Sequence, residues 1–496
     1  MKKQIVFPLL VILLSAALSS SMLDRDHDWG DDWAAYVMQA ESILTGSTHE
    51  FAVRNTFTTQ ESTTFIGPVA YPWGFPALLV PFYAGCGGLD ILCLKSVNVI
   101  FFALFLAVFF VFLHRRLSLF DSILLLSVFA FSPTLLNFHN NLLSDIPFLF
   151  FSSLALLLIE TTLITRDDFA GGILPNVGLG AALFAAFFVR TNGVLLVPTL
   201  FLTQVVLFWR TRRTVTRDPR RVIPLALIPY LVFGLLTALI LTVFPAGEGS
   251  HLEHYAALTW SRVLGNLAAY INMPAAFFEN VPLAPILYGA TLPFVLGGAV
   301  LNAKKDFHLS IYIVLSLALF ITWPDTQGIR FLFPLLPFIF YFALRGMNAT
   351  AFALLDYYRK AGDRLTRLFW AGILLSFIIT SIGLARDNLA SQRAPDGGPF
   401  EDISAEMIEF VKSNTPPDSV LIFYKPRALR LMTGRDALVV DDCAALGKGD
   451  YVVIRKKRGA VGQVLPDTVT TCNPSLLVTE VFDNEKYVVY EIRLKP

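Results

Sequence analysis

Long apolar runs separated by short polar segments dominate this chain of 496 residues. A helix needs about 17 to 25 mostly apolar residues to cross the roughly 30 Å hydrocarbon core of a bilayer. Runs of that length predict a polytopic α-helical membrane protein. We expect eleven transmembrane helices, near residues 4–22, 94–113, 119–138, 142–163, 172–190, 193–209, 222–244, 281–301, 308–323, 329–347 and 367–385.

One further apolar stretch, Tyr71–Tyr83, is not counted as a span. Its three prolines, Pro72, Pro76 and Pro81, are unfavourable in the interior of a helix. The tyrosines at its ends and Trp73 suit the headgroup level of a membrane. We therefore expect an interfacial segment within a long first external loop, residues 23–93.

Basic residues fall in alternate loops between the predicted spans, as the positive-inside bias requires. The N-terminal run that begins Lys2-Lys3 favours a retained signal-anchor helix over a cleaved secretory signal, and either one delivers residue 23 to the outside. With the N-terminus in the cytoplasm, the cytoplasmic loops contain Arg115, Arg116, Arg166, Arg210, Arg212, Arg213, Arg217, Arg220, Arg221, Lys304, Lys305, Arg359, Lys360, Arg364 and Arg367.

The chain becomes polar after residue 385, and residues 386–496 are numerous enough for a small domain. Ile403, Met407, Phe410 and Val411 form the apolar face of a helix that ends before Pro416. We expect a membrane domain over 1–385 and a small extracytoplasmic α/β domain, periplasmic or extracellular, over 386–496. Its strands are predicted at Val420–Tyr424, Leu438–Val440, Tyr451–Ile454, Leu476–Phe482 and Tyr487–Ile492.

The four cysteines are Cys86, Cys93, Cys443 and Cys472. Their spacings do not match those of metal sites, so the sequence predicts no zinc site. Cys443 and Cys472 both lie in the extracytoplasmic domain, where disulfides persist, and the sequence is as consistent with a bridge as with two thiols.

Composition agrees with the membrane assignment. Hydrophobic residues make up 55% of the chain and charged residues only 16%, against about 25% in soluble domains. The mean hydropathy is +0.61. A net charge of +1 offers no basic surface, so we expect the lipid bilayer and no nucleic acid as a partner.

An acidic cluster follows the first predicted span: Asp24-Arg25-Asp26-His27-Asp28-Trp29-Gly30-Asp31-Asp32. A helix should follow, capped by Asp31 or Asp32 and ended by Gly46. Its predicted face consists of Tyr36, Ala40, Ile43 and Leu44. Capping explains one aspartate only. The rest form either a solvated charged linker or a functional site, because charge near hydrocarbon is costly.

The pattern Asp31-Asp32-x-x-x-Tyr36 resembles the Asp-Glu/Asp-x-x-x-Tyr loop of GT-C membrane glycosyltransferases. These include protein O-mannosyltransferases and lipid A aminoarabinose transferases. Asp32 stands where the mannosyltransferase pattern has Glu, which leaves the subfamily open. The resemblance extends to Tyr71-Pro-Trp-Gly-Phe-Pro76, Ser144-Asp145-Ile-Pro147, Arg190-Thr-Asn-Gly193 and Gln327-Gly-Ile-Arg330, and, for bacterial members, to Tyr424-Lys-Pro-Arg427 and Thr433-Gly-Arg435.

The resemblance implies an inverting glycosyltransferase of a bacterial inner (plasma) membrane. It would move a sugar from a polyprenyl-phosphate carrier to a lipid, glycan or protein acceptor at the external face. Asp31 would be the general base. Asp32 would orient the acceptor, stabilise developing charge or join a divalent cation, and the sequence does not separate these roles. The metal ligands are therefore unknown.

A phosphate leaving group calls for cationic side chains. The expected substrate-binding residues are Arg330 first, then Arg190, Lys95 and Lys425, together with Tyr36 and Asp145. Each has a structural alternative: an arginine at the end of a span can reach lipid headgroups, and Asp145 can cap a helix.

Two other classes of protein remain open. A secondary transporter would have a similar number of spans, but the sequence lacks an obvious internal repeat and charges at mid-span depth. A non-catalytic lipid-binding assembly subunit would have the same loops and would tolerate the loss of Asp31.

Overall fold

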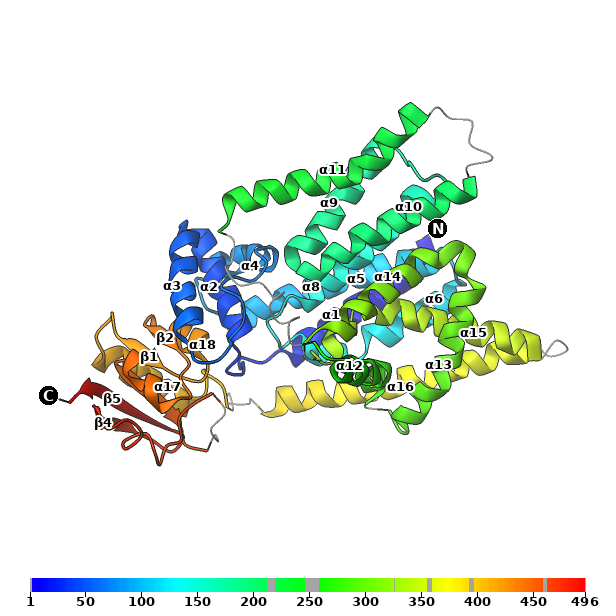
Figure 1. Cartoon of the computed structure of the whole chain (residues 1–496). Coiled ribbons are helices and arrows are strands. Elements are labelled where there is room, and N and C mark those ends of the chain that lie inside the picture. Colours follow the sequence, from blue (N-terminus) through cyan, green and yellow to red (C-terminus); the bar gives the residue numbers. More distant parts are fainter. Residues whose placement is uncertain are drawn as a thin grey trace.

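The computed structural model describes residues 2–211, 219–245, 258–279, 281–324, 326–354, 359–391, 397–457 and 462–495. A large helical part is followed by a small sheet domain at the C-terminal end (Figure 1). The predicted cytoplasmic residues Arg212, Arg213 and Arg217 lie outside the described residues.

The helices before the sheet domain are α1 (Lys2–Met22), α2 (Asp31–Thr45), α3 (Thr48–Glu61), α4 (Gly74–Gly85), α5 (Ile91–His114), α6 (Leu119–Ala130), α7 (Pro133–Phe138), α8 (Asp145–Ile159), α9 (Ile173–Val189), α10 (Leu196–Thr211), α11 (Pro219–Val243), α12 (Trp260–Asn272), α13 (Ala284–Leu301), α14 (Ala303–Thr322), α15 (Leu336–Leu354) and α16 (Arg359–Ser391). Among the described residues, eight helical segments are long and apolar enough to cross a membrane. They lie in α1, α5, α8, α10, α11, α13, α14 and α16 and correspond to eight of the eleven predicted spans.

The other three predicted spans are divided, shortened or begun by a 3₁₀ turn. The 119–138 span is divided into α6 and α7, and the 172–190 span contains the 17-residue helix α9. In the 329–347 span a 3₁₀ turn, Ile329–Leu332, precedes α15. Pro133 lies at the start of α7, where the missing amide hydrogen of proline leaves no helical bond unmade.

The segment after Tyr71, expected to be interfacial, forms helix α4 although prolines are unfavourable in a helix interior. Pro76 lies in the first turn, where proline is tolerated, and Pro81 lies inside the helix. Twelve residues extend about 18 Å at 1.5 Å each, too short to cross a bilayer. Leaving this segment out of the spans is therefore consistent with the structure.

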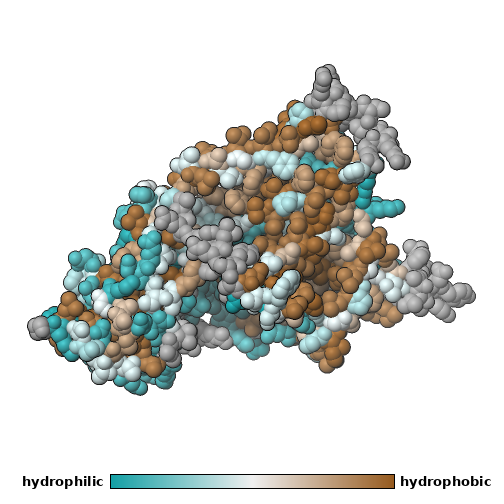
Figure 2. All heavy atoms as spheres, in the orientation of Figure 1, coloured by the Kyte–Doolittle hydropathy of each residue, from teal (hydrophilic) through white to brown (hydrophobic). Residues whose placement is uncertain are grey.

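The loops predicted to be cytoplasmic lie together at one end of the helices. Arg116 pairs with Asp306 at 2.9 Å, and Arg210 donates to the carbonyl of Lys304 at 2.7 Å. The first external loop and the sheet domain lie at the other end (Figure 1). Figure 2 shows the same division, with a largely apolar surface over the helices and a polar one over the sheet domain. Which end faces the cytoplasm stays a prediction.

The C-terminal region contains helices α17 (Asp402–Asn414) and α18 (Pro426–Thr433) and a five-stranded sheet. The predicted helix and four of the five strands are confirmed, whereas β2 ends at Leu438, where the predicted strand begins, and α18 was not predicted. The strand order is β2-β1-β3-β5-β4, parallel among the first three strands and antiparallel from β3 onward. The strands are β1 (Val420–Ile422), β2 (Asp436–Leu438), β3 (Tyr451–Arg455), β4 (Leu476–Asp483) and β5 (Tyr487–Leu494).

Two disulfides connect the four cysteines. Cys443 and Cys472 are bridged, which resolves the alternative that the sequence left open. Cys86 and Cys93 form a second bridge, which the sequence analysis did not predict, between the end of α4 and the start of α5.

The first external loop packs directly against the sheet domain. Arg54 of α3 pairs with Asp436 of β2 at 2.8 Å. The indole of Trp29 donates to the hydroxyl of Tyr487 at 3.0 Å, and α2 lies against α18. These contacts bring residues from the two ends of the chain to one place, where the candidate site lies.

Candidate active site

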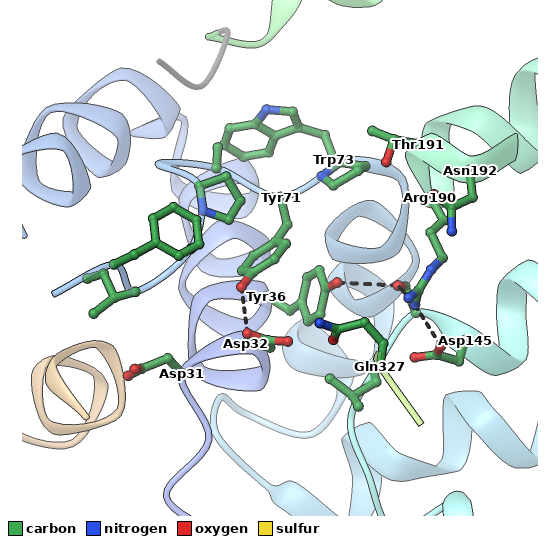
Figure 3. Close-up of a pocket in the computed structure, with 18 of the residues that line it drawn as sticks. Asp31, Asp32, Tyr36, Tyr71, Trp73, Asp145, Arg190, Thr191, Asn192 and Gln327 are labelled. Carbon is green, nitrogen blue, oxygen red and sulfur yellow. Dashed lines mark hydrogen bonds and ion pairs between the residues drawn. The ribbon is translucent and has the colours of Figure 1, made fainter. Parts of the chain in front are cut away.

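A cavity of about 940 Å³ lies where the first external loop, the ends of several membrane helices and the sheet domain meet. Figure 3 shows side chains from these separate segments directed toward a common space. Seven of the eight predicted site residues line the cavity: Asp31, Asp32, Tyr36, Asp145, Arg190, Arg330 and Lys425.

The two aspartates lie in the first turn of α2. The N-cap position is Gly30 and no side chain caps the helix, so the predicted capping role of Asp31 or Asp32 is wrong. Both carboxylates instead lie beside the positive end of the helix dipole, which stabilises their charge. Gly46 ends the helix as predicted, in a left-handed conformation with φ 72°.

Asp31 is directed toward the sheet domain (Figure 3). Its Oδ1 accepts a hydrogen bond from the backbone amide of Arg427, at the start of α18, at 3.1 Å. Its Oδ2 lies 3.9 Å from Nζ of Lys425. Burial raises the pKa of Asp31 to about 6, even though Lys425 and Arg427 act in the opposite direction. The group therefore remains mainly ionised at neutral pH and takes up a proton just below it.

Asp32 is directed toward the opposite side of α2 from Asp31 (Figure 3). Its Oδ1 accepts a 2.5 Å hydrogen bond from the hydroxyl of Tyr71. The ring of Tyr71 in turn packs on that of Tyr36, with centroids 4.9 Å apart. Two tyrosines thus fix the wall beside Asp32, and burial raises the pKa of both, so their hydroxyls stay protonated as donors.

Arg190, 16% exposed, and the buried Asp145 form an ion pair on the other side of the cavity. Nη1 of Arg190 lies 2.7 Å from Oδ1 of Asp145 and 3.3 Å from the hydroxyl of Ser144. Tyr36 also contacts Ser144, at 3.3 Å, which connects the pair to α2. The N-cap residue of α8 is Ser144 and no side chain caps the helix, so the capping role of Asp145 is wrong. That Arg190 reaches lipid headgroups stays an untested alternative.

Arg330 lies in the 3₁₀ turn before α15 and donates to Oε1 of Gln327 at 2.8 Å. Lys425 is 36% exposed and approaches the cavity from the sheet domain. Together with Arg190, these residues bring three cationic side chains to the walls around the two aspartates.

Lys95 is the predicted site residue that the structure places elsewhere. It is fully buried, and its Nζ contacts Oδ1 of Asp24 at 2.6 Å and the carbonyl of Asp26 at 2.5 Å. It does not line the cavity. Its contacts account for the first part of the acidic cluster, because they hold the segment between α1 and α2 against α5.

Two glycines, both in motifs that resemble those of the glycosyltransferases, allow backbone segments to approach closely around the cavity. A Cβ atom on Gly74 would lie 2.4 Å from backbone atoms of Phe188 in α9. A Cβ on Gly193 would lie 2.4 Å from the carbonyl carbon of Ala186. Both positions require glycine, and they set Trp73 and Arg190, respectively, at the cavity wall.

One part of the cavity wall is apolar. The indole of Trp73 stacks on Phe244 at the end of α11, with centroids 4.8 Å apart and an interplanar angle of 18°. Further apolar lining there comes from Phe187, Phe188, Ile240 and Leu241. The cavity therefore combines an apolar wall with a charged one, as a site for an amphipathic molecule requires.

The described part of the chain contains no group of three or more His, Cys, Asp or Glu side chains that could hold a metal ion. Asp31 and Asp32 supply two carboxylates, each with one oxygen already bonded within the protein. These residues do not by themselves form a complete site for a divalent cation.

Sequence reasoning missed the roles of Arg427, which reaches into the first loop, and of Tyr71, which was assigned to the interface. Both belong to motifs noted above, but their partners are distant along the chain. Only folding brings Arg427 to Asp31 and Tyr71 to Asp32.

No family model and no curated protein matches the chain. Solved structures do. ArnT from Cupriavidus metallidurans bound to undecaprenyl phosphate superposes with a TM-score of 0.58 at 13% identity, over 97% of both chains. The Archaeoglobus fulgidus oligosaccharyltransferase superposes with 0.60 at 12% identity, over 97% of this chain and 74% of that one. Its complex with an inhibitory peptide and a dolichol-phosphate gives 0.54 at 12% identity, with the same coverage. The chain therefore shares the fold of these two enzymes, as the resemblance of its motifs to GT-C membrane glycosyltransferases led us to expect.

Proposed function

We propose that the protein is a glycosyltransferase that moves a sugar from a polyprenyl-phosphate carrier to an acceptor at the external face of a bacterial inner membrane. The observation that carries this proposal is the cavity itself. It places two carboxylates at the start of α2 opposite cationic side chains, beside an apolar wall. A lipid-linked sugar phosphate needs each of these three features.

The proposed reaction is a single displacement at the anomeric carbon. The acceptor hydroxyl gives its proton to Asp31 while its oxygen bonds to that carbon. The bond from the carbon to the phosphate oxygen breaks, and the electron pair leaves with the polyprenyl phosphate. Attack from the face opposite the phosphate inverts the configuration. A pKa of about 6 keeps Asp31 ionised at neutral pH and lets it accept the proton.

The orientations of the aspartates suggest where each substrate binds. Asp31 is directed toward the sheet domain, so the acceptor would approach between that domain and the first loop. Asp32 is directed toward the interior of the cavity, where it would accept hydrogen bonds from the donor sugar or stabilise positive charge on its ring. Tyr71 holds it in that orientation.

Arg330, Arg190 and Lys425 would bind the phosphate as negative charge develops on it. Arg330 is the first candidate, since its partner among the described residues is the neutral Gln327, whereas Asp145 balances Arg190. A charge that is not already balanced interacts more strongly with an incoming anion. We assign no step to a metal, because the described residues contain no group of three or more His, Cys, Asp or Glu side chains placed to hold one.

The apolar wall of Trp73 and Phe244 would hold the first isoprene units of the carrier, which would enter from the bilayer. ArnT, which shares this fold, has been crystallised with undecaprenyl phosphate. A structure of the oligosaccharyltransferase holds an inhibitory peptide and a dolichol-phosphate. Both support a lipid-linked donor here, whereas the acceptor is a lipid, a glycan or a protein.

The proposal is tested with purified protein in detergent or nanodiscs. It is incubated with undecaprenyl-phosphate sugars and with lipid, glycan and peptide acceptors, and glycosylated products are identified by mass spectrometry. We expect transfer by the wild type and none by Asp31→Asn. Solute uptake into proteoliposomes without transfer would support a transporter. Binding of the carrier without transfer, equal in both proteins, would support a non-catalytic assembly subunit.

A further inference from the structure

Arg427 belongs to the sheet domain but extends into the first external loop. It is the second residue of α18, and its side chain is fully buried despite its charge. A buried guanidinium is tolerated only where its hydrogens are bonded, so its partners indicate what it does.

The guanidinium binds the segment that follows α3. Nη1 donates to the carbonyl of Ile66 at 3.2 Å, Nη2 donates to the carbonyl of Pro68, and Nε donates to Oδ1 of Asn55 at 3.3 Å. Gly67, between the two carbonyls, has φ +107°, which favours glycine. A Cβ there would lie 2.9 Å from the hydroxyl of Tyr71 and 3.2 Å from Nη1 of Arg427. Arg427 therefore fixes the path of this segment toward Tyr71.

The same guanidinium also contacts Tyr71 itself. Nη1 lies 3.5 Å from the tyrosine hydroxyl, and the guanidinium carbon lies 5.5 Å from the ring centroid. That hydroxyl donates its hydrogen to Asp32 at 2.5 Å. The contacts thus run in sequence from Arg427 through Tyr71 to Asp32.

The backbone of Arg427 holds the other carboxylate. Its amide donates to Asp31 at 3.1 Å, at the start of α18, where the helix dipole also favours a negative charge. One residue of the sheet domain is therefore connected to both aspartates, through different atoms.

We propose that Arg427 is the positioning residue of the carboxylate pair: its amide fixes Asp31, and its side chain fixes Asp32 through Tyr71. The sheet domain then completes the site instead of only covering it. This inference rests on the proposed function. Arginine suits the role better than lysine, because its planar fork bonds several acceptors at fixed angles, whereas an ammonium is a point charge.

The charge of Arg427 acts on Asp31 as well. Burial raises the pKa of Asp31, Lys425 and Arg427 lower it, and neighbouring Asp32 raises it. Removing the guanidinium should therefore raise the pKa of Asp31 further. A residue that served only to stabilise the fold would not move the pH dependence of transfer.

The test compares Arg427→Met and Arg427→Lys with a matched control, Arg430→Met. Arg430 is one turn further along α18 and 4% exposed, and it contacts Met38 and Thr58 instead of the segment before Tyr71. We expect kcat of Arg427→Met to fall about 100-fold, the loss typical of a small misplacement of reacting groups. The acidic limb of its pH–kcat profile should move to higher pH. Arg427→Lys should restore the position of that limb but not kcat. Arg430→Met should keep kcat and shift the limb less than Arg427→Met does, because Arg430 also interacts with Asp31 but is not among the main causes of its pKa.

Hydrogen exchange gives a second measurement, which does not depend on activity. In the full-length protein, Arg427→Met should exchange faster over residues 62–73 and at the start of α2, and Arg430→Met should match the wild type there. Equal exchange in the two variants would overturn the positioning role, as would equal kcat and pH dependence. A wild type without transfer would refute the proposed function instead, and exchange would still decide the role of Arg427.

Discussion

The hydroxyl of Tyr71 donates a 2.5 Å hydrogen bond to Oδ1 of Asp32, across 39 positions of the sequence. This bond connects the loop before α4 with the start of α2 and holds one of the two carboxylates at the cavity wall. A neutral hydroxyl bound to a carboxylate orients the carboxylate without cancelling its charge, which a group that binds a sugar or a developing cation needs.

Tyr71→Phe removes this bond and keeps the ring that packs on Tyr36. We expect transfer to fall by about 10- to 100-fold, the equivalent of a lost hydrogen bond to a charged group. Initial rates at saturating donor measure the effect. Tyr83→Phe, in α4 and outside the cavity lining, serves as the control. Equal rates for both variants would remove the bond to Asp32 from the mechanism.

The pH dependence of transfer should report Asp31. Burial raises its pKa from 3.8 to about 6, and the base works only when ionised. Activity should therefore fall as the pH drops through about 6, and a titration of kcat between pH 4.5 and 8 measures it. An acidic limb near 4 would indicate a different, exposed base.

The same shift predicts an effect on stability. The raised pKa means that the folded state favours the protonated carboxyl of Asp31. The contribution of this carboxyl to the free energy of unfolding is therefore complete below pH 3.8 and is lost as the pH rises through about 6. Asp31→Asn avoids this loss. At pH 7.5 it should melt at or above the temperature of the wild type, and the gain should disappear at pH 4. A variant that is inactive because it unfolds would instead melt lower at both pH values.

The ion pair of Arg190 and Asp145 can be separated into structural and functional parts. Arg190→Gln leaves the buried carboxylate of Asp145 without its partner, which costs about 3–5 kcal/mol. Asp145→Asn should cost less, because the side chain of Arg190 is 16% exposed. The double variant should recover most of that stability. If the pair also binds substrate, the double variant will fold but use the donor poorly. Full activity in the stable double variant would assign the pair to the fold alone.

Arg330→Gln should weaken use of the donor without unfolding the protein, because the side chain is only partly buried and its bond is to Gln327. We expect KM for the donor to rise and inhibition by free polyprenyl phosphate to weaken by a similar factor. Arg367→Gln is the control, since Arg367 pairs with Asp121 at the opposite end of the helices. Unchanged donor kinetics in Arg330→Gln would reject its role in binding phosphate.

Features that depend on residues close together in the sequence could be predicted, whereas those that depend on distant residues could not. Spans, strands and the start of α2 depend on neighbouring residues, so hydropathy and periodicity revealed most of them. The division of the 119–138 span and helix α18 depend on local proline positions, which we gave too little weight. Lys95 was predicted to bind substrate because a phosphate leaving group calls for cationic side chains, but it pairs with Asp24, 71 residues earlier in the sequence, and lies away from the cavity. Arg427 was missed for a related reason, since its partners lie about 360 to 400 residues earlier.

The most direct test of the central claim is a single-turnover reaction with an undecaprenyl-phosphate sugar labelled at the anomeric carbon, run with wild type and Asp31→Asn at pH 7.5. We expect the wild type to yield a glycoside of inverted configuration, and Asp31→Asn to bind the donor with similar affinity but to form no product. Product formation by Asp31→Asn at the rate of the wild type, or retained configuration in the wild-type product, would contradict it.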